Sequence, residues 1–173
     1  MATSRTGKDA CDLLEADHRA LKKLFKDYEI LRTSRARGTA QKKSDLARQI
    51  CQQLNVHAQI EEELFYPALR RAMKETDLLE EAEVEHQVLK ELVTQIQEGL
   101  AGLQGPDAAI DARVRVLGEY LDHHVKEERT ELFAKARAAR KLDLQALRLQ
   151  LEDRREALLD RLPAGTPAAE IAG

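Results

Sequence analysis

Hydrophobic residues recur along this chain at steps of three and four, the period of one face of an α-helix. Four such runs lie between residues 9 and 133 and are separated by polar or glycine-containing stretches. The pattern predicts four amphipathic helices whose apolar faces also carry histidines and glutamates. In chain order these faces consist of Leu14, His18, Leu21, Phe25 and Tyr28; Ile50, Leu54, His57, Glu61, Leu64 and Ala68; Leu79, Ala82, His86, Leu89, Val93, Ile96 and Leu100; and Val114, Leu117, Leu121, His124, Glu128 and Leu132.

A fifth amphipathic segment follows these runs, and we expect it to form a helix packed outside the others. Its apolar positions are Leu144, Leu147, Leu151 and Leu158. Pro67 lies near the end of the second run, where a helix is expected to kink or finish. The predicted organisation is a flexible N-terminus (1–8), a helical bundle (9–138), a C-terminal helix (139–162) and a disordered tail (163–173).

The chain contains an internal repeat. Equivalent residues lie 68 positions apart in the first and third runs, and 67 positions apart in the second and fourth. A duplicated helical hairpin predicts an all-α fold, an antiparallel up-down four-helix bundle in which equivalent side chains of both halves converge in the core. The matched pairs are Glu15 and Glu83, His18 and His86, Lys22 and Lys90, His57 and His124, and Glu61 and Glu128.

Composition and charge restrict the classes of partner. The 173 residues fit one domain, and 28 Lys plus Arg against 31 Asp plus Glu leave a net charge of -3, too weak a field to favour nucleic acid or an anionic membrane. No apolar run approaches the roughly 20 residues that span a bilayer, and residues 1–9 do not resemble a signal peptide. We therefore expect a cytoplasmic protein, with Cys11 and Cys51 as free thiols rather than a disulfide.

The histidines and glutamates on the predicted core faces require partners, since unpaired polar groups are costly to bury. In each HxxxE pair the two side chains lie one helical turn apart, so both can bind one small centre. Imidazole with carboxylate suits iron, manganese or zinc, and two carboxylates able to bridge favour a dinuclear site. We expect two non-haem iron ions, joined by an oxo or hydroxo bridge, with manganese as second choice. The predicted ligands are His18, His57, Glu61, His86, His124 and Glu128.

Other interpretations stay open for some of these residues. An HxxxE pair can be an exposed helical pair, and His18 or His86 can be a core histidine hydrogen-bonded to a neighbour. His123 is turned about 100° from His124 around the helix, so we expect it at the surface or behind the ligands. We expect Lys22 and Lys90 to reach into solvent, and Glu15 and Glu83 to be exposed or supporting carboxylates. The aromatic residues should pack around the site; they are Phe25, Tyr28, Phe65, Tyr66, Tyr120 and Phe133.

The motif order, a lone His, HxxxE, a second lone His and a second HxxxE, resembles that of the hemerythrin-like or HHE cation-binding domains. The resemblance extends from Leu14 to about Phe133 and includes Glu-Ala-Asp-His at 15–18 and His-Ala-Gln-Ile-Glu-Glu-Glu-Leu-Phe-Tyr-Pro at 57–67. It implies a non-haem di-iron centre in a four-helix bundle, with Glu61 and Glu128 bridging and the histidines as terminal ligands. Oxygen binding is the activity of the best-known members.

The chain departs from the oxygen-carrying members at Ala82 and Lys90, where they place a second histidine, and at Arg129, where they place an aspartate. The resemblance therefore implies a less saturated centre with positions open to a small ligand. We expect a protein that binds O2, peroxide or nitric oxide in sensing, storage or iron homeostasis. The alternatives are an oxidoreductase acting on the same molecules and a protein in which metal only holds the fold. No residue outside the metal ligands is assigned a catalytic role.

Overall fold

The computed structural model describes residues 8–102 and 105–162, and the regular elements within them are all helical. The all-α prediction is confirmed. Most of the predicted flexible N-terminus and the whole predicted tail lie outside the described residues. The elements are α1 (Ala10–Thr33), α2 (Thr39–Ile60), the π-helical turn η1 (Glu61–Phe65), α3 (Tyr66–Ala72), α4 (Asp77–Leu100), α5 (Ala108–Glu127), the π-helical turn η2 (Glu128–Leu132), α6 (Phe133–Ala138) and α7 (Leu144–Leu159).

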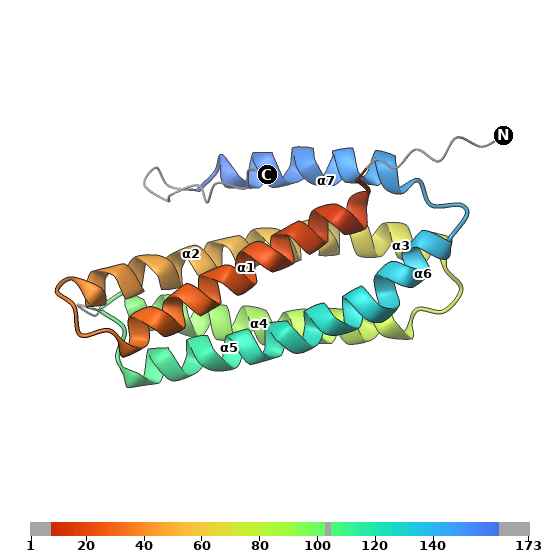
Figure 1. Cartoon of the computed structure of the whole chain (residues 1–173). Coiled ribbons are helices and arrows are strands. Elements are labelled where there is room, and N and C mark those ends of the chain that lie inside the picture. The colour runs from red at the N-terminus through yellow and green to blue at the C-terminus, as the bar shows by residue number, and fades with distance from the viewer. Residues whose placement is uncertain (1–7, 103–104, 163–173) are drawn as a thin grey trace.

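The helices form an antiparallel up-down bundle (Figure 1). Helix α2 continues through η1 into α3, and α5 continues through η2 into α6, so each half of the repeat is one long hairpin. Within the bundle α1 packs against α2 and α5, and α4 packs against α5 and α2. Helix α7 lies along α1 and α2 on the outside of the bundle, as expected for the fifth amphipathic segment. No helix in the described part of the chain is long and apolar enough to cross a membrane.

Aspartates begin three of the helices. The Asp9 carboxylate accepts a hydrogen bond of 3.0 Å from the Asp12 backbone N–H, and the Asp12 carboxylate accepts one of 2.8 Å from the Asp9 N–H. Asp107 caps α5 through the Ile110 N–H at 2.9 Å, and Asp143 caps α7. Such caps satisfy backbone donors that the first helical turn leaves unpaired, so they define where each helix starts.

The buried face of α4 is the predicted one, from Leu79 to Leu100. The second run differs after Glu61, because η1 places one extra residue in a turn and shifts every later side chain around the helix axis. Leu64, expected in the core, is only partly buried, whereas Phe65 and Tyr66 are both fully buried. The predicted interruption near Pro67 is therefore a π-helical turn before the proline and not the end of the helix.

The core consists of two apolar clusters, and the histidines separate them along the bundle. On α1, for example, Leu14 belongs to one cluster and Leu21 to the other, with His18 between them. Of the aromatic residues expected near the site, Tyr120 is 47% exposed, because it lies on the outer face of α5, so that prediction is wrong for this residue. Cys11 and Cys51 are buried free thiols.

Candidate metal centre

The structure brings the predicted site residues together in the middle of the bundle. Each of the four long helical segments contributes, and none of the six side chains is more than 2% exposed. The polar atoms fall into two overlapping groups that share Glu61, and within each group they lie within 4.8 Å of one another. The first group is His18, His57, Glu61 and Glu128, and the second is Glu61, His86 and His124.

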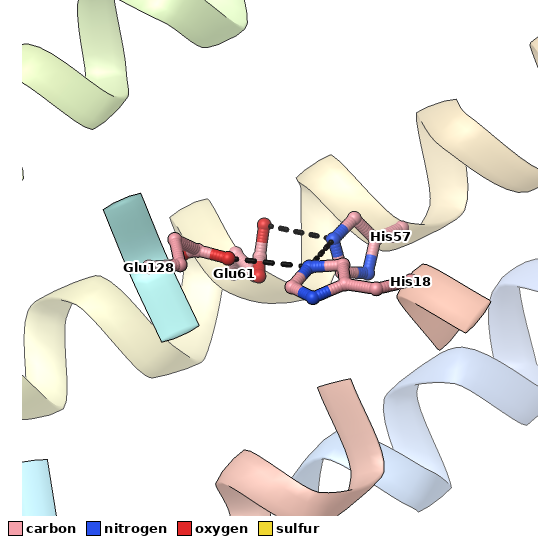
Figure 2. Close-up of side chains that lie close together, drawn as sticks. All are labelled: His18, His57, Glu61 and Glu128. Atoms are coloured by element: carbon pink, nitrogen blue, oxygen red, sulfur yellow. Dashed lines mark hydrogen bonds and ion pairs between the residues drawn. The ribbon is translucent and has the colours of Figure 1, made fainter. Parts of the chain in front are cut away.

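In the first group the two imidazoles and the two carboxylates point toward one another (Figure 2). The Nε2 atoms of His18 and His57 are 3.0 Å apart. His18 Nε2 lies 3.2 Å from Glu128 Oε2, and His57 Nε2 lies 3.3 Å from Glu61 Oε2. Two ligand atoms each about 2.1 Å from a tetrahedral metal ion lie about 3.4 Å apart, so these spacings match the edges of a coordination shell.

The second group has similar spacings. His86 Nε2 lies 3.2 Å from His124 Nε2 and 3.3 Å from Glu61 Oε2, and His124 Nε2 lies 3.6 Å from Glu128 Oε2. Each glutamate therefore lies between a histidine of the first half of the chain and a histidine of the second half. This placement is what two bridging carboxylates require.

Several buried polar atoms of this cluster have no hydrogen-bond partner among the described residues. They include both carboxylate oxygens of Glu61, which is 0% exposed, and Oε2 of Glu128. Leaving a carboxylate unpaired in an apolar interior costs several kcal/mol, roughly, even after the protein relaxes. A cation between the carboxylates and the imidazoles would satisfy these carboxylate oxygens.

The hydrogen bonds of the two imidazoles in the second group are also compatible with a cation between them. His86 Nδ1 lies 2.9 Å from Glu62 Oε1, and His124 Nδ1 lies 2.7 Å from Glu85 Oε2. A carboxylate only accepts hydrogen bonds, so each Nδ1 donates, and in a neutral imidazole Nε2 then carries a lone pair. Two such lone pairs would face each other at 3.2 Å, so either a proton on one Nε2 or a bound cation must lie between them.

The pKa values of the two glutamates shift in opposite directions. Burial and the nearby Glu128 carboxylate raise the pKa of Glu61 well above its usual range. Burial opposes ionisation of Glu128 too, but His124 and His18 hold the pKa of Glu128 below its usual value. Without metal, Glu61 therefore binds a proton more readily than Glu128 does, and a bound cation would compete with that proton.

The pKa values of three of the histidines also shift in different directions. Burial lowers the pKa of His18 to about 4. Burial also disfavours protonation of His57 and His124, but the carboxylates of Glu61 and Glu128 respectively outweigh it and raise the pKa of each. In the metal-free site His57 and His124 therefore hold protons more strongly than a free histidine does, and cation binding must displace any proton on Nε2.

Each HxxxE glutamate is the first residue of a π-helical turn, Glu61 in η1 and Glu128 in η2. Pro67 follows η1, but no proline follows η2, so proline does not cause these turns. They share instead the position of the glutamate and the burial of two successive aromatic or leucine residues after it. A π-helical turn is a common way to aim side chains into a functional site.

The carboxylates that support the histidines were not among the residues predicted from the sequence. Glu62 contacts His86 and also pairs with Lys90, while Glu85 contacts His124. In the first half, Asp17 Oδ2 lies 3.7 Å from His57 Nδ1, and its other oxygen accepts a 2.6 Å hydrogen bond from Arg155 of α7. A signal existed, because an acid directly precedes each lone histidine, and that acid serves the histidine of the following helix.

Tyr66 is a further residue at the site. Its hydroxyl donates a 3.0 Å hydrogen bond to Glu128 Oε1 and lies 3.2 Å from His86 Nε2. Burial and the nearby Glu128 raise the pKa of Tyr66 well above its usual value, so it stays protonated. The equivalent residue in the second half is Phe133, whose ring stacks against His18 at 5.9 Å between ring centres.

The remaining predicted residues lie outside the cluster. Glu15 pairs with Arg129, and Glu83 pairs with Arg70, both at the surface. Lys22 and Lys90 are exposed, as expected. His123 is 64% exposed and points away from the centre.

The donor set fits a hard or borderline divalent cation. Four imidazole nitrogens and two carboxylates suit iron, manganese or zinc, and they offer no thiolate. His18, His57, Glu61, His86, His124 and Glu128 could hold such ions. The geometry therefore supports binding of a metal ion of this class.

Comparison with known proteins agrees with this site. The hemerythrin HHE cation-binding domain family matches residues 9–136, which span the four helices and all six site residues. No curated protein and no solved structure matches the sequence significantly. The match covers well over half of the chain, and it includes the repeat, the two HxxxE pairs and both lone histidines. The chain therefore belongs to the hemerythrin HHE cation-binding domain family.

Proposed function

We propose that this protein holds two non-haem iron ions through these six residues and that the iron pair binds O2 or a related small ligand. The observation that carries the proposal is Glu61, a carboxylate at 0% exposure that lies between histidines of both halves and whose oxygens have no hydrogen-bond partner among the described residues. Two bridging carboxylates and two histidines for each ion fit a dinuclear iron centre, with manganese as the second choice.

Binding of a small ligand follows from the unsaturated ligand set. Lys90 and Arg129 stand where oxygen carriers place ligands, and here they pair with the partly buried glutamates Glu62 and Glu15. A pocket of about 10 Å³, lined in part by Ala82, His124 and Glu128, lies beside the centre and is about large enough for one water. When bound, iron supplies open coordination positions and reversible redox chemistry. Sensing, storage and iron homeostasis are the roles that fit.

The test is metal content together with absorption spectra of the reduced and the air-oxidised protein. We expect two irons per chain and near-ultraviolet charge-transfer bands after oxidation. Both should be lost in Glu61→Gln and kept in Glu119→Gln, an exposed glutamate on α5. One zinc ion per chain in the purified protein, with no iron taken up on reconstitution, would overturn the proposal.

Tyr66 favours a second candidate function, an oxidoreductase that acts on peroxide, O2 or nitric oxide. Its hydroxyl donates to Glu128 Oε1 and lies 3.2 Å from His86 Nε2, so it places a proton at the centre, and reduction of these molecules consumes protons. Steady turnover of peroxide by the iron-loaded protein, slowed in Tyr66→Phe, would support this candidate. Spectra that no small ligand changes, with melting of the bundle on iron removal, would contradict both functions.

A further inference from the structure

A third group of potential metal ligands lies on the outer surface of α4 and α5. It consists of His123, Glu85 and Glu127, which we call the surface triad. His123 Nε2 lies 3.5 Å from Glu85 Oε1 and 3.3 Å from Glu127 Oε1, longer than a good hydrogen bond and close to the spacing of two ligands on one ion. The side chains of these residues are 64%, 20% and 36% exposed in that order, so solvent reaches them.

Glu85 connects the surface triad to the proposed iron centre. Its Oε1 faces His123, while its Oε2 accepts the 2.7 Å hydrogen bond from His124 Nδ1. One carboxylate therefore contacts an exposed histidine on one side and a buried ligand histidine on the other. An ion at the surface triad would be separated from the centre only by this carboxylate and its immediate neighbours.

A small pocket adjoins both the surface triad and the proposed centre. The pocket beside the centre is lined by Glu85 and Glu127 of the surface triad and by His124 and Glu128 of the centre. Glu128 is 2% exposed, and its Oε2 has no hydrogen-bond partner among the described residues. At about 10 Å³ the pocket holds about one water or one ion that has lost most of its hydration shell. Glu128, whose Oε2 lacks a hydrogen-bond partner, thus lines the same pocket as two residues of the surface triad.

The first half of the chain has no such surface. The positions equivalent to His123 and Glu127 are Val56 and Ile60, which are 7% and 0% exposed. Both belong to the apolar cluster that includes Leu147 of α7, the helix that covers this side of the bundle. The duplication therefore leaves one open face beside the centre, and that face carries an imidazole and two carboxylates.

We propose that the surface triad captures Fe2+ from solution and passes it through this pocket to His124 and Glu128. The proposal rests on the proposed iron centre. Transfer is a ligand exchange: the ion leaves His123 and the triad carboxylates and gains Glu128 oxygen and His124 Nε2. No electron moves, and the ion stays in the +2 state. Weak, exposed ligands suit capture because an ion must also leave them quickly, whereas the buried centre retains it.

The kinetic test compares iron uptake by three metal-free proteins: the wild type, His123→Gln/Glu127→Gln and the control Glu119→Gln. Glu85 is left unchanged because it also supports His124. We expect uptake of Fe2+ in the absence of oxygen to slow about tenfold in the double variant, in the range that removal of steering charges produces. The final iron content should stay at the wild-type value, and Glu119→Gln should behave as the wild type. Uptake as fast as in the wild type, or loss of iron at saturation, would overturn the proposal.

A second measurement separates the surface triad from the buried centre. Mn2+ binding to the metal-free protein, followed by the electron paramagnetic resonance of free Mn2+, should reveal three sites, of which the weakest is lost in the double variant. If the iron centre is wrong but the surface triad is right, the wild type binds one ion and the double variant none. Equal numbers of sites in the wild type and the double variant would exclude the surface triad.

Discussion

The two halves of this protein supply the same site residues but surround them differently. In the second half, His86 and His124 each donate Nδ1–H to a carboxylate at 2.9 and 2.7 Å. In the first half, the nearest carboxylate to His57 Nδ1 is 3.7 Å away, and His18 Nδ1 has no hydrogen-bond partner among the described residues. A hydrogen-bonded carboxylate orients an imidazole and raises its basicity, so the two proposed metal positions have different surroundings.

Single residues next to the ligands produce this difference. Glu62, which supports His86, is replaced by Arg129 at the equivalent position of the second half, and Arg129 turns outward to Glu15. Tyr66 is likewise replaced by Phe133. The duplicated hairpin therefore preserves the six site residues, while Glu62 and Tyr66, which contact them, have different residues at the equivalent positions. The proposed metal position near His86 and Tyr66 therefore has polar surroundings. The one near His18 and Phe133 has apolar surroundings.

The largest expected effect comes from removing one lone histidine from each half. His86→Ala should weaken binding of the second iron by about 100-fold or more, because it removes a ligand supported by Glu62. The loss of iron affinity in His18→Ala should be about tenfold smaller, since no described carboxylate accepts a hydrogen bond from His18 Nδ1. Iron affinity measured by anaerobic titration with a competing chelator would show the ranking. Equal losses in the two variants would mean that the supporting carboxylates do not distinguish the halves.

The supporting carboxylates can be tested directly. Glu62→Gln should lower iron affinity about tenfold or more, because an amide is a poorer partner for the Nδ1–H of His86. Asp17→Asn should have a smaller effect on affinity, because its contact with His57 is 3.7 Å long. The same chelator titration measures both variants, with Glu119→Gln as control. A larger loss in Asp17→Asn would reverse the proposed order of the halves.

Substitutions at Tyr66 and at Phe133, the equivalent residues of the two halves, test the polar side of the centre. Tyr66→Phe should lower the free energy of unfolding of the metal-free protein by about 2 kcal/mol, since it removes a buried hydrogen bond to the charged Glu128. Phe133→Ala should destabilise the protein through a cavity instead, by about 3 to 5 kcal/mol, and should leave the Tyr66 hydrogen bond intact. Urea denaturation gives both values. An unchanged stability of Tyr66→Phe would mean that this hydrogen bond contributes nothing.

The smallest expected effect is the response to pH. The raised pKa values of His57 and His124 mean that both take up protons at a higher pH than a free histidine, and these protons compete with the metal. Affinity for Fe2+ should therefore fall as the pH is lowered through and below neutrality. His18, with a pKa of about 4, should not take part until far more acid conditions. Titration at several pH values, with the number of protons released per ion, checks this; no proton release near pH 7 would contradict it.

Much of this molecule follows from helical periodicity. The buried face of α4 agrees with the predicted one from Leu79 to Leu100, and the six polar residues expected in the core are all buried together. This succeeds because a side chain's direction on a helix depends only on its spacing from its neighbours. The repeat also predicted that equivalent residues would converge, as they do around Glu61 and Glu128.

Other features depend on which helices meet, so they required the folded chain. The π-helical turns that begin at Glu61 and Glu128 changed the register after each glutamate and brought Tyr66 to the centre, where periodicity had favoured Leu64. The contacts of Asp17 with His57 and Arg155, and of Glu85 with His124 and His123, join residues on different helices. Local spacing specifies which residues face the core, because it is a property of one helix. Which atoms then touch across the bundle is set by packing between helices, and that is why the likeness of the two halves was visible in the chain and their inequivalence was not.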